Sequence, residues 1–341
     1  MNKNLVRILL FAAFAVRAGA ALAQAPAENA RCLQCHGNEA IAQKTPAERA
    51  LMVRPAGGAP ARENAAPLYV SHQVYDHSVH GRIACTSCHP DCDTLPHPIR
   101  TAPPQCAQCH LQQQTEYEGS AHGQARTGGD RAAARCSDCH GAHDILSARN
   151  PQSRTFKLQL PFTCANCHAN AGMMEATKVR QPNAAQQYVD SMHGRGLIVQ
   201  GLIVAPSCND CHGVHNIWPA TDPRSTIHKD QIPQTCGKCH VGVEQTYRDS
   251  VHGRLLASGD QRGPVCATCH TAHEINKPGI ASFKLASDDR CGQCHADRLA
   301  RYRETFHGKA MALGQPGVAA CYDCHGHHDI VPISNPSSRL S

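Results

Sequence analysis

The sequence predicts a chain of mostly irregular coil with short α-helices, whose core is not built from large apolar side chains. Aromatic residues make up 4% of the 341 residues, so the side chains that usually fill a core are scarce. The 22 prolines and 26 glycines interrupt regular structure along the whole chain. Cysteine reaches 21 and histidine 24, which indicates that groups bound by these residues fill the interior.

Residues 1–23 predict a secretory signal peptide. A positively charged start precedes the apolar run from Ile8 to Val16, and Ala21-Leu22-Ala23 fits a small-x-small cleavage site. The run is too short to span a membrane, and no stretch of residues 24–341 is apolar enough to do so. We therefore expect an exported protein with no transmembrane segment in the mature chain, located in the periplasm, with association with the outer membrane as a further option.

Ten C-x-x-C-H motifs account for all the cysteines except Cys92, whereas chance predicts about 0.1 such motif at this composition. The motif attaches haem c: two thiols three positions apart form thioethers with the two vinyl groups of one haem, and the adjacent histidine is its proximal iron ligand. The predicted attachment residues are Cys32, Cys35, Cys85, Cys88, Cys106, Cys109, Cys136, Cys139, Cys164, Cys167, Cys208, Cys211, Cys236, Cys239, Cys266, Cys269, Cys291, Cys294, Cys321 and Cys324. The predicted proximal ligands are His36, His89, His110, His140, His168, His212, His240, His270, His295 and His325.

Two other uses of paired cysteines fit the pattern poorly. Zinc ribbons do not require a histidine directly after each pair, and redox dithiols occur singly rather than in series. Ten haems leave about 32 residues of mature chain for each, below the roughly 40 residues that a separate core needs. The predicted fold is therefore a multihaem cytochrome c array in which the haems form the core.

A second motif, Y-x-x-[ST]-x-H-G, occurs five times, each time between two C-x-x-C-H motifs. Its copies are Tyr75–Gly81, Tyr117–Gly123, Tyr188–Gly194, Tyr247–Gly253 and Tyr302–Gly308. The mature chain, 24–341, therefore divides into five two-haem repeats. We number them I to V, with approximate bounds 24–100, 101–155, 156–228, 229–282 and 283–341. Within repeat I, the Ala- and Pro-rich segment Pro46–Pro67 predicts a flexible linker, with a docking arm as the alternative.

The second axial position of each iron needs another ligand. Four C-x-x-C-H motifs continue as C-H-x-x-H, and this added histidine leaves its helix on nearly the same side as the proximal one. It cannot reach the far face of its own haem, so we expect it to bind a neighbouring haem. The distal ligands expected from both repeated motifs are His80, His122, His143, His193, His215, His252, His273, His307 and His328.

The tenth distal ligand is open between several residues of repeat I. Its second motif reads CHPDC, with Cys92 where the other repeats have a histidine. We favour His97, which lies between two prolines that restrict the backbone. Cys92 is the alternative and would give a low-potential thiolate haem; His72 and His77 are further candidates.

The charge gives no evidence for an anionic partner. The formal net charge of +6 falls to about +3 when the signal peptide leaves, and the propionates of ten haems would add about −10 in the ferric state. We expect no nucleic-acid binding.

The motifs quoted above resemble those of multihaem c-type cytochromes with doubled C-x-x-C-H motifs, over nearly all of the mature chain. The chain is also similar to the periplasmic decahaem cytochromes of outer-membrane conduits. The resemblance implies mostly bis-histidine haems and partners that are redox proteins: a quinol-oxidising membrane cytochrome, an outer-membrane porin-cytochrome or a terminal reductase. It implies electron transfer in anaerobic or extracellular, metal-linked respiration.

We do not expect an enzyme, because the histidines suffice to fill every iron and no C-x-x-C-K motif is present. One alternative is a terminal oxidoreductase acting on a sulfur or nitrogen oxyanion at one atypically ligated haem. Another is the subunit of an extracellular cytochrome filament.

Overall fold

The computed structural model describes residues 26–54, 68–177, 181 and 183–341, so the expected signal peptide lies outside the described residues. This described part consists of helices and turns without a β-strand, apart from an isolated bridge between Arg54 and Pro98. The helices are short, the longest being the 12 residues of α18 (Ala281–Gly292). The predicted fold class, coil with short α-helices, is confirmed.

The chain divides into two compact units, Met1–Pro103 and Pro104–Ser341. The division falls close to the boundary expected between repeats I and II. The N-terminal unit thus corresponds to repeat I and the C-terminal unit to repeats II to V.

The N-terminal unit contains short helices around its two C-x-x-C-H motifs. They are α1 (Asn29–His36), α2 (Ala40–Gln43), α3 (Pro46–Ala50), α4 (His72–His77), α5 (Cys85–Cys88) and the 3₁₀-helix η2 (Pro90–Cys92).

Helix α3 corrects the linker expected over Pro46–Pro67 for the part that is described; residues 55–67 lie outside it. Thr45 and Glu48 form a capping box, in which the Thr45 N–H donates to the Glu48 carboxylate at 2.7 Å and the Thr45 hydroxyl accepts from the Glu48 N–H at 3.3 Å. Pro46 occupies the first turn, where its missing N–H costs no hydrogen bond. These start signals outweigh the Ala- and Pro-rich composition.

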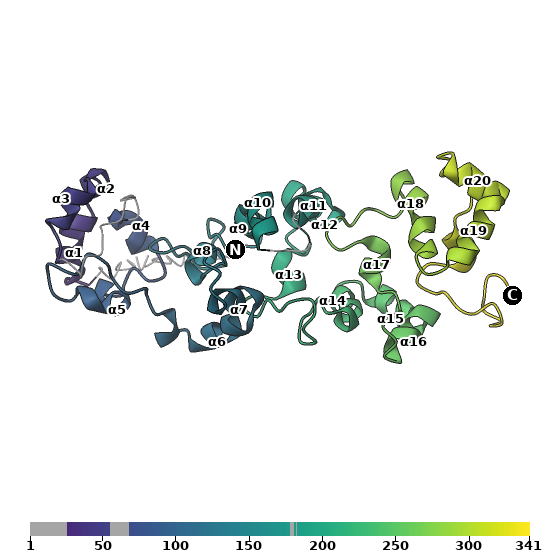
Figure 1. Cartoon of the computed structure of the whole chain (residues 1–341), viewed down its shortest axis with the longest axis horizontal. Coiled ribbons are helices and arrows are strands. Elements are labelled where there is room, and N and C mark those ends of the chain that lie inside the picture. The colour runs from purple at the N-terminus through teal and green to yellow at the C-terminus, as the bar shows by residue number, and fades with distance from the viewer. Residues whose placement is uncertain (1–25, 55–67, 178–180, 182) are drawn as a thin grey trace, which may run out of the picture. The chain divides into compact units, whose positions relative to one another are not determined.

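The C-terminal unit is a succession of helices joined by turns (Figure 1). They are η3 (Cys106–Gln108), α6 (Leu111–Gly119), α7 (Ala121–Thr127), α8 (Cys136–His140), α9 (Leu160–His168), α10 (Ala171–Ala176), α11 (Ala184–Asp190), α12 (Met192–Gly194), the π-helical η4 (Arg195–Val199), α13 (Cys208–His212), η5 (Lys229–Gln231), α14 (Ile232–Gly237), α15 (Val241–Asp249), α16 (Val251–Ala257), α17 (Cys266–His270), α18 (Ala281–Gly292), α19 (Ala296–Glu304), α20 (Phe306–Ala312) and α21 (Cys321–His325).

The two motif-bearing helices of a repeat pack together. In repeats III, IV and V, the helix of the first motif contacts the helix of the second: α9 with α13, α14 with α17, and α18 with α21. The packing places the two C-x-x-C-H motifs of one repeat side by side.

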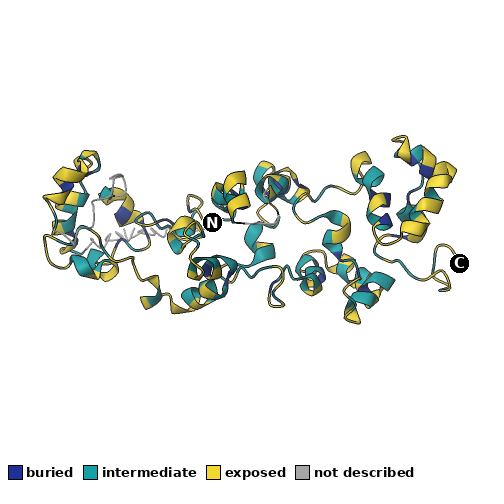
Figure 2. Cartoon of the chain, viewed as in Figure 1, coloured by how far each residue is buried: buried dark blue, intermediate teal, exposed yellow. Residues whose placement is uncertain are grey.

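Side chains alone do not make a continuous apolar core. Figure 2 shows that most described residues are exposed or half-buried. The buried apolar residues are scattered along the chain: Ile41, Tyr75, Met174, Leu197, Val265, Met311 and Ala320. This agrees with a fold whose interior is completed by bound groups. Within the described ranges, no helix combines the length and apolarity needed to cross a bilayer.

Candidate haem-binding sites

The second motif of each repeat in the C-terminal unit forms its own one-turn helix. Helices α8, α13, α17 and α21 each begin at the first cysteine and end at the proximal histidine. In three of them an aspartate inside the motif accepts a hydrogen bond from the backbone N–H before the helix: Asp138 from Arg135, Asp210 from Ser207 and Asp323 from Ala320, at 2.7–2.8 Å. Because residues three and four apart share a helix face, the two cysteines and the histidine project to one side.

The tyrosine of the Y-x-x-[ST]-x-H-G motif anchors this second C-x-x-C-H motif. In all five repeats its hydroxyl donates to the backbone carbonyl two residues before the first cysteine, at 2.6–2.8 Å. The pairs are Tyr75 with Ile83, Tyr117 with Ala134, Tyr188 with Pro206, Tyr247 with Pro264 and Tyr302 with Ala319. Burial raises the pKa of Tyr75 and of Tyr247 to about 12, so both phenols stay protonated and donate.

The serine and glycine of the same motif shape the turn that carries its histidine. Ser250 caps α16: its hydroxyl accepts from the Gly253 N–H at 3.1 Å and donates to the Tyr247 carbonyl at 2.6 Å. A Cβ at Gly253 would lie 2.1 Å from that same carbonyl oxygen, closer than any side chain allows. Repeats II and III use the same geometry with Ser120 and Ser191. The motif thus fixes the backbone on both sides of its histidine.

The C-H-x-x-H histidine follows a backbone turn with positive φ. Gly141, Gly213 and Gly326 have φ of 89°, 85° and 85°, and Thr271 has 64°. This left-handed region favours glycine, which explains the glycine of C-H-G-x-H. The turn places the second histidine away from the helix that carries the proximal one.

Predicted proximal and distal histidines meet in pairs whose spacing fits an iron atom. With metal–nitrogen bonds of about 2.0–2.1 Å and about 1.1 Å from the nitrogen to the ring centre, imidazoles on opposite faces of one iron have centres about 6.3 Å apart. The paired rings lie 5.9–6.4 Å apart. The pairs are His36 with His97, His122 with His168, His140 with His215, His193 with His240, His212 with His273, His252 with His295 and His270 with His328.

The pairs of the C-terminal unit follow one rule. The Tyr-motif histidine of one repeat faces the first proximal histidine of the next, as His193 faces His240. The C-H-x-x-H histidine faces the second proximal histidine of the preceding repeat, as His273 faces His212. Adjacent repeats therefore exchange histidines, and each such pair joins residues of two repeats.

Backbone contacts repeat with the same period. The residue before the Tyr-motif histidine donates its N–H to the carbonyl of an isoleucine that follows the C-H-x-x-H of the next repeat. These bonds are 2.8 Å long and join Ala121 to Ile217, Met192 to Ile275 and Val251 to Ile330.

Within each repeat, the first cysteines of the two motifs interact through their side chains. These pairs are Cys32 with Cys85, Cys106 with Cys136, Cys164 with Cys208, Cys236 with Cys266 and Cys291 with Cys321. Sharing a proton between two half-buried thiols raises the pKa of Cys164 and lowers that of Cys208. The first cysteines of the two motifs thus lie within interaction distance of each other in every repeat.

Burial favours the neutral form of several paired imidazoles. Burial, with the His273 imidazole opposite as the second cause, lowers the pKa of His212 to about 4. Burial likewise lowers the pKa of His122, His140 and His168. A neutral imidazole has a free nitrogen lone pair, which is the form that binds iron.

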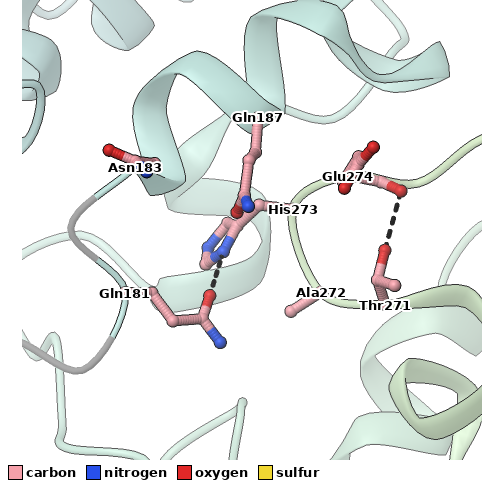
Figure 3. Close-up of a pocket in the computed structure, with 7 residues that line it drawn as sticks. All are labelled: Gln181, Asn183, Gln187, Thr271, Ala272, His273 and Glu274. Carbon is pink, nitrogen blue, oxygen red and sulfur yellow. Dashed lines mark hydrogen bonds between the residues drawn. The ribbon is translucent and has the colours of Figure 1, made fainter.

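Hydrogen bonds to Nδ1 leave Nε2 of several paired rings available as the iron ligand. In repeat I, His36 Nδ1 donates to the Leu68 carbonyl at 2.7 Å and His97 Nδ1 to the Pro98 carbonyl at 2.8 Å. In repeat IV, His273 Nδ1 donates to the amide oxygen of Gln181 at 2.5 Å (Figure 3). Such outer contacts orient an imidazole toward its metal.

The candidates for the tenth distal ligand have different surroundings, and His97 stays the favoured prediction. His97 faces His36, whereas Cys92 lies in η2 with its Sγ 3.9 Å from Asp91 Oδ1. Burial and the neighbouring Asp91 raise the pKa of Cys92 to about 11, so the thiol is protonated as long as it binds no metal. Pro90 stands where the other repeats have positive φ, and a proline ring cannot adopt that turn.

Histidines that belong neither to a C-x-x-C-H or C-H-x-x-H motif nor to the Tyr motif also have local partners. In helix α4, His72 Nδ1 lies 2.9 Å from Asp76 Oδ2, and His77 Nδ1 donates to the Gln73 carbonyl at 2.7 Å. His327 packs on Tyr322, with ring centres 4.9 Å apart.

Not every predicted ligand stands opposite another imidazole. Within the described part of the chain, exposed His307 lies against the Phe306 ring at 5.9 Å rather than opposite a proximal histidine. No imidazole ring of the described residues pairs with His325. The ligand roles of all the predicted proximal and distal histidines, His80, His89, His110 and His143 included, stay predictions.

Sequence reasoning missed the tyrosine anchors and the Nδ1 partners. The anchors had a signal, because each tyrosine precedes its C-x-x-C-H motif within one repeat. Partners such as Leu68 and Gln181 leave no pattern in the sequence, since they depend on where separate segments meet.

Comparison with known proteins bears on two of the C-x-x-C-H motifs. Residues 257–300 match the family model of the doubled CXXCH motif. This segment contains the motifs Cys266–His270 and Cys291–His295. The doubled motif is that of multihaem c-type cytochromes, which bind haem c covalently and transfer electrons. No solved structure matches the chain.

Proposed function

We propose that this chain is an exported, periplasmic cytochrome that binds ten haem c groups and carries electrons in anaerobic or extracellular, metal-linked respiration. The observation that carries the proposal is the set of histidine pairs at 5.9–6.4 Å, each joining a C-x-x-C-H histidine to a second imidazole.

The residues present fit haem c. Each paired proximal histidine follows two cysteines at the spacing that haem attachment needs, and a second ring stands at the distance expected across one iron. When bound, haem c supplies a one-electron couple at iron. Two imidazoles on one iron leave no position for a substrate, so paired sites favour electron transfer over catalysis.

Two kinds of contact would keep successive sites close. Inside a repeat, the first cysteines of the two motifs touch, as Cys236 and Cys266 do. Between repeats of the C-terminal unit, exchanged histidines such as His252 and His295 tie one repeat to the next. The polypeptide therefore holds attachment points at short intervals along that unit.

The proposed partners are redox proteins: a quinol-oxidising membrane cytochrome as donor, and an outer-membrane porin-cytochrome or a terminal reductase as acceptor. This assignment rests on the predicted export and on the resemblance of the motifs. A catalytic haem with a Cys92 ligand is disfavoured, because His97 rather than Cys92 stands opposite His36.

The test uses the full-length protein matured in a host that attaches haem c in its periplasm. We expect the intact mass to show ten haems and loss of residues 1–23. We expect low-temperature electron paramagnetic resonance of the oxidised protein to show predominantly bis-histidine low-spin haems. A mass with fewer haems, or a spectrum dominated by high-spin iron, would overturn the proposal.

A further inference from the structure

The C-H-x-x-H histidines of repeats III and IV meet different chemical groups at Nδ1. In repeat III, His215 Nδ1 lies 3.4 Å from Oε2 of Glu116, with side chains 30% and 35% exposed. In repeat IV, the corresponding His273 Nδ1 donates to the neutral amide of Gln181. A carboxylate and an amide thus face otherwise equivalent ligands.

Glu116 is held in this position from two directions. Its other oxygen, Oε1, accepts from the Gln112 amide at 2.9 Å, one turn earlier in α6. The segment that carries His215 is fixed by the bond from the Ala121 N–H to the Ile217 carbonyl at 2.8 Å. The ring of Trp218 packs so closely on Gly119 that a Cβ there would lie 2.3 Å away. The carboxylate therefore faces His215 in a fixed arrangement.

The position of Glu116 recurs in the Tyr motif. Glu116 directly precedes Tyr117, and the residue directly before Tyr188 in the next repeat is Gln187. Gln187 lines the same open pocket as His273, beside Gln181 and Thr271 (Figure 3). The residue before the motif tyrosine thus lies next to the C-H-x-x-H histidine of the following repeat in both cases, as glutamate in one and glutamine in the other.

We propose that Glu116 is a positioning residue that lowers the reduction potential of the haem held between His140 and His215, and that this repeat position sets the relative potentials of neighbouring haems. The inference rests on the proposed haem ligation. A negative charge at Nδ1 makes the imidazole a stronger donor and favours ferric over ferrous iron. Neutral Gln187 gives the haem between His212 and His273 no such bias, so its potential is higher.

The test is a spectroscopic redox titration at fixed pH on the fully matured protein. We expect Glu116→Gln to raise the midpoint potential of one haem, with up to a tenfold change in its reduction equilibrium, which is 59 mV for one electron. The reciprocal Gln187→Glu should lower the potential of one haem. Glu118→Gln is the matched control, because Glu118 is exposed on the same helix and bonds to Gln114 at 2.7 Å.

The outcomes distinguish an effect of Glu116 on the haem potential from a role in holding His215 in place. A shift in Glu116→Gln without one in Glu118→Gln, with haem count and low-spin spectrum unchanged, supports the proposal. Equal shifts of the midpoint potential in both variants would overturn the proposal, because Glu116 would then act only as any surface carboxylate does. A new high-spin signal in Glu116→Gln would also overturn it, since Glu116 would then only hold His215 in place. The haem count, measured by mass in the same samples, tests the proposed function independently.

Discussion

Repeat I and repeat III have the same motif order but supply a distal histidine in different ways. In repeat III, Gly213 takes a positive φ of 85° and the following His215 faces His140 of repeat II. In repeat I, Pro90 replaces the glycine, and His97 faces His36 of the same repeat. Two differences after the proximal histidine accompany this change: Pro90 stands in place of the glycine, and Cys92 in place of the C-H-x-x-H histidine.

The comparison shows what a repeat needs in order to be extended. Within the C-terminal unit, a single repeat does not form these histidine pairs by itself, because each pair takes one histidine from a neighbouring repeat. Repeat arrays of this kind require terminal units that differ from the internal ones. Repeat I differs from the internal repeats in this way, because His36 faces His97 of the same repeat.

The largest effect is expected when repeat III receives a proline at the position that Pro90 occupies in repeat I. Gly213→Pro removes the N–H that donates to the Asn209 carbonyl at 3.0 Å and forbids positive φ, at a cost of about 3 kcal/mol or more. We expect His215 to leave its position and the haem at His140 to become high-spin and to bind carbon monoxide when reduced. Carbon monoxide titration checks this, with Pro90→Ala as the control; an unchanged low-spin spectrum would contradict the role of the turn.

Removal of His97 tests the closure of repeat I directly. We expect His97→Ala to convert one haem to a high-spin form, because no other imidazole faces His36 in the described structure. Cys92→Ala should leave the spectrum unchanged. Electron paramagnetic resonance of the two oxidised variants checks this. A spectral change in Cys92→Ala would indicate that the Cys92 thiol, and not His97, is the ligand.

The Tyr-motif glycine is tighter in repeat IV than in repeat I. A Cβ at Gly253 would lie 2.1 Å from the Tyr247 carbonyl oxygen, whereas at Gly81 the nearest atom is 2.6 Å away. We expect Gly253→Ala to cost about 1–3 kcal/mol of stability, and Gly81→Ala to cost less. Urea unfolding measures both. Gly242→Ala in helix α15 is the control, since no atom lies within 4 Å of the added Cβ and a gain of about 0.5–1 kcal/mol is expected. Equal losses for both motif glycines would argue against the steric explanation.

The tyrosine anchor is common to both regions, and its loss should have the smallest effect. Tyr247→Phe removes the bond to the Pro264 carbonyl, 2.8 Å long, at a cost of about 1 kcal/mol. The raised pKa of Tyr247 adds a pH signature: its stabilisation is present below the ordinary tyrosine pKa of about 10 and is lost as pH rises through about 12. Thermal melts at pH 8 and above pH 10 check this. If the variant showed the same alkaline loss as the parent protein, the titration would belong to another group.

Much of the architecture could be predicted because the motifs encode local geometry. The C-x-x-C-H spacing fixes which side chains share a helix face, and the period of the Tyr motif predicts where repeats begin. The expectation that a C-H-x-x-H histidine serves a neighbouring haem follows from helix direction, and His215, His273 and His328 each face a histidine of the preceding repeat.

What could not be predicted depends on contacts between distant segments. Sequence spacing alone does not show whether His97 or Cys92 faces His36, because that depends on how the chain between His36 and Pro98 folds back toward His36. Helix α3 was missed because composition was weighed above the capping box of Thr45 and Glu48. Glu116 carries no motif, and only the packing of α6 against the segment after His212 brings it to His215.

The contacts between first cysteines impose an order on biogenesis. Before haem is attached, pairs such as Cys106 and Cys136 are thiols in contact, and an oxidising compartment converts adjacent thiols to disulfides. A disulfide there would block both attachment sites of a repeat at once. If the chain is exported and binds haem as proposed, it must receive its haems before each repeat closes or be kept reduced until then. Protection of the thiols would then limit the yield of mature protein as much as the supply of haem does.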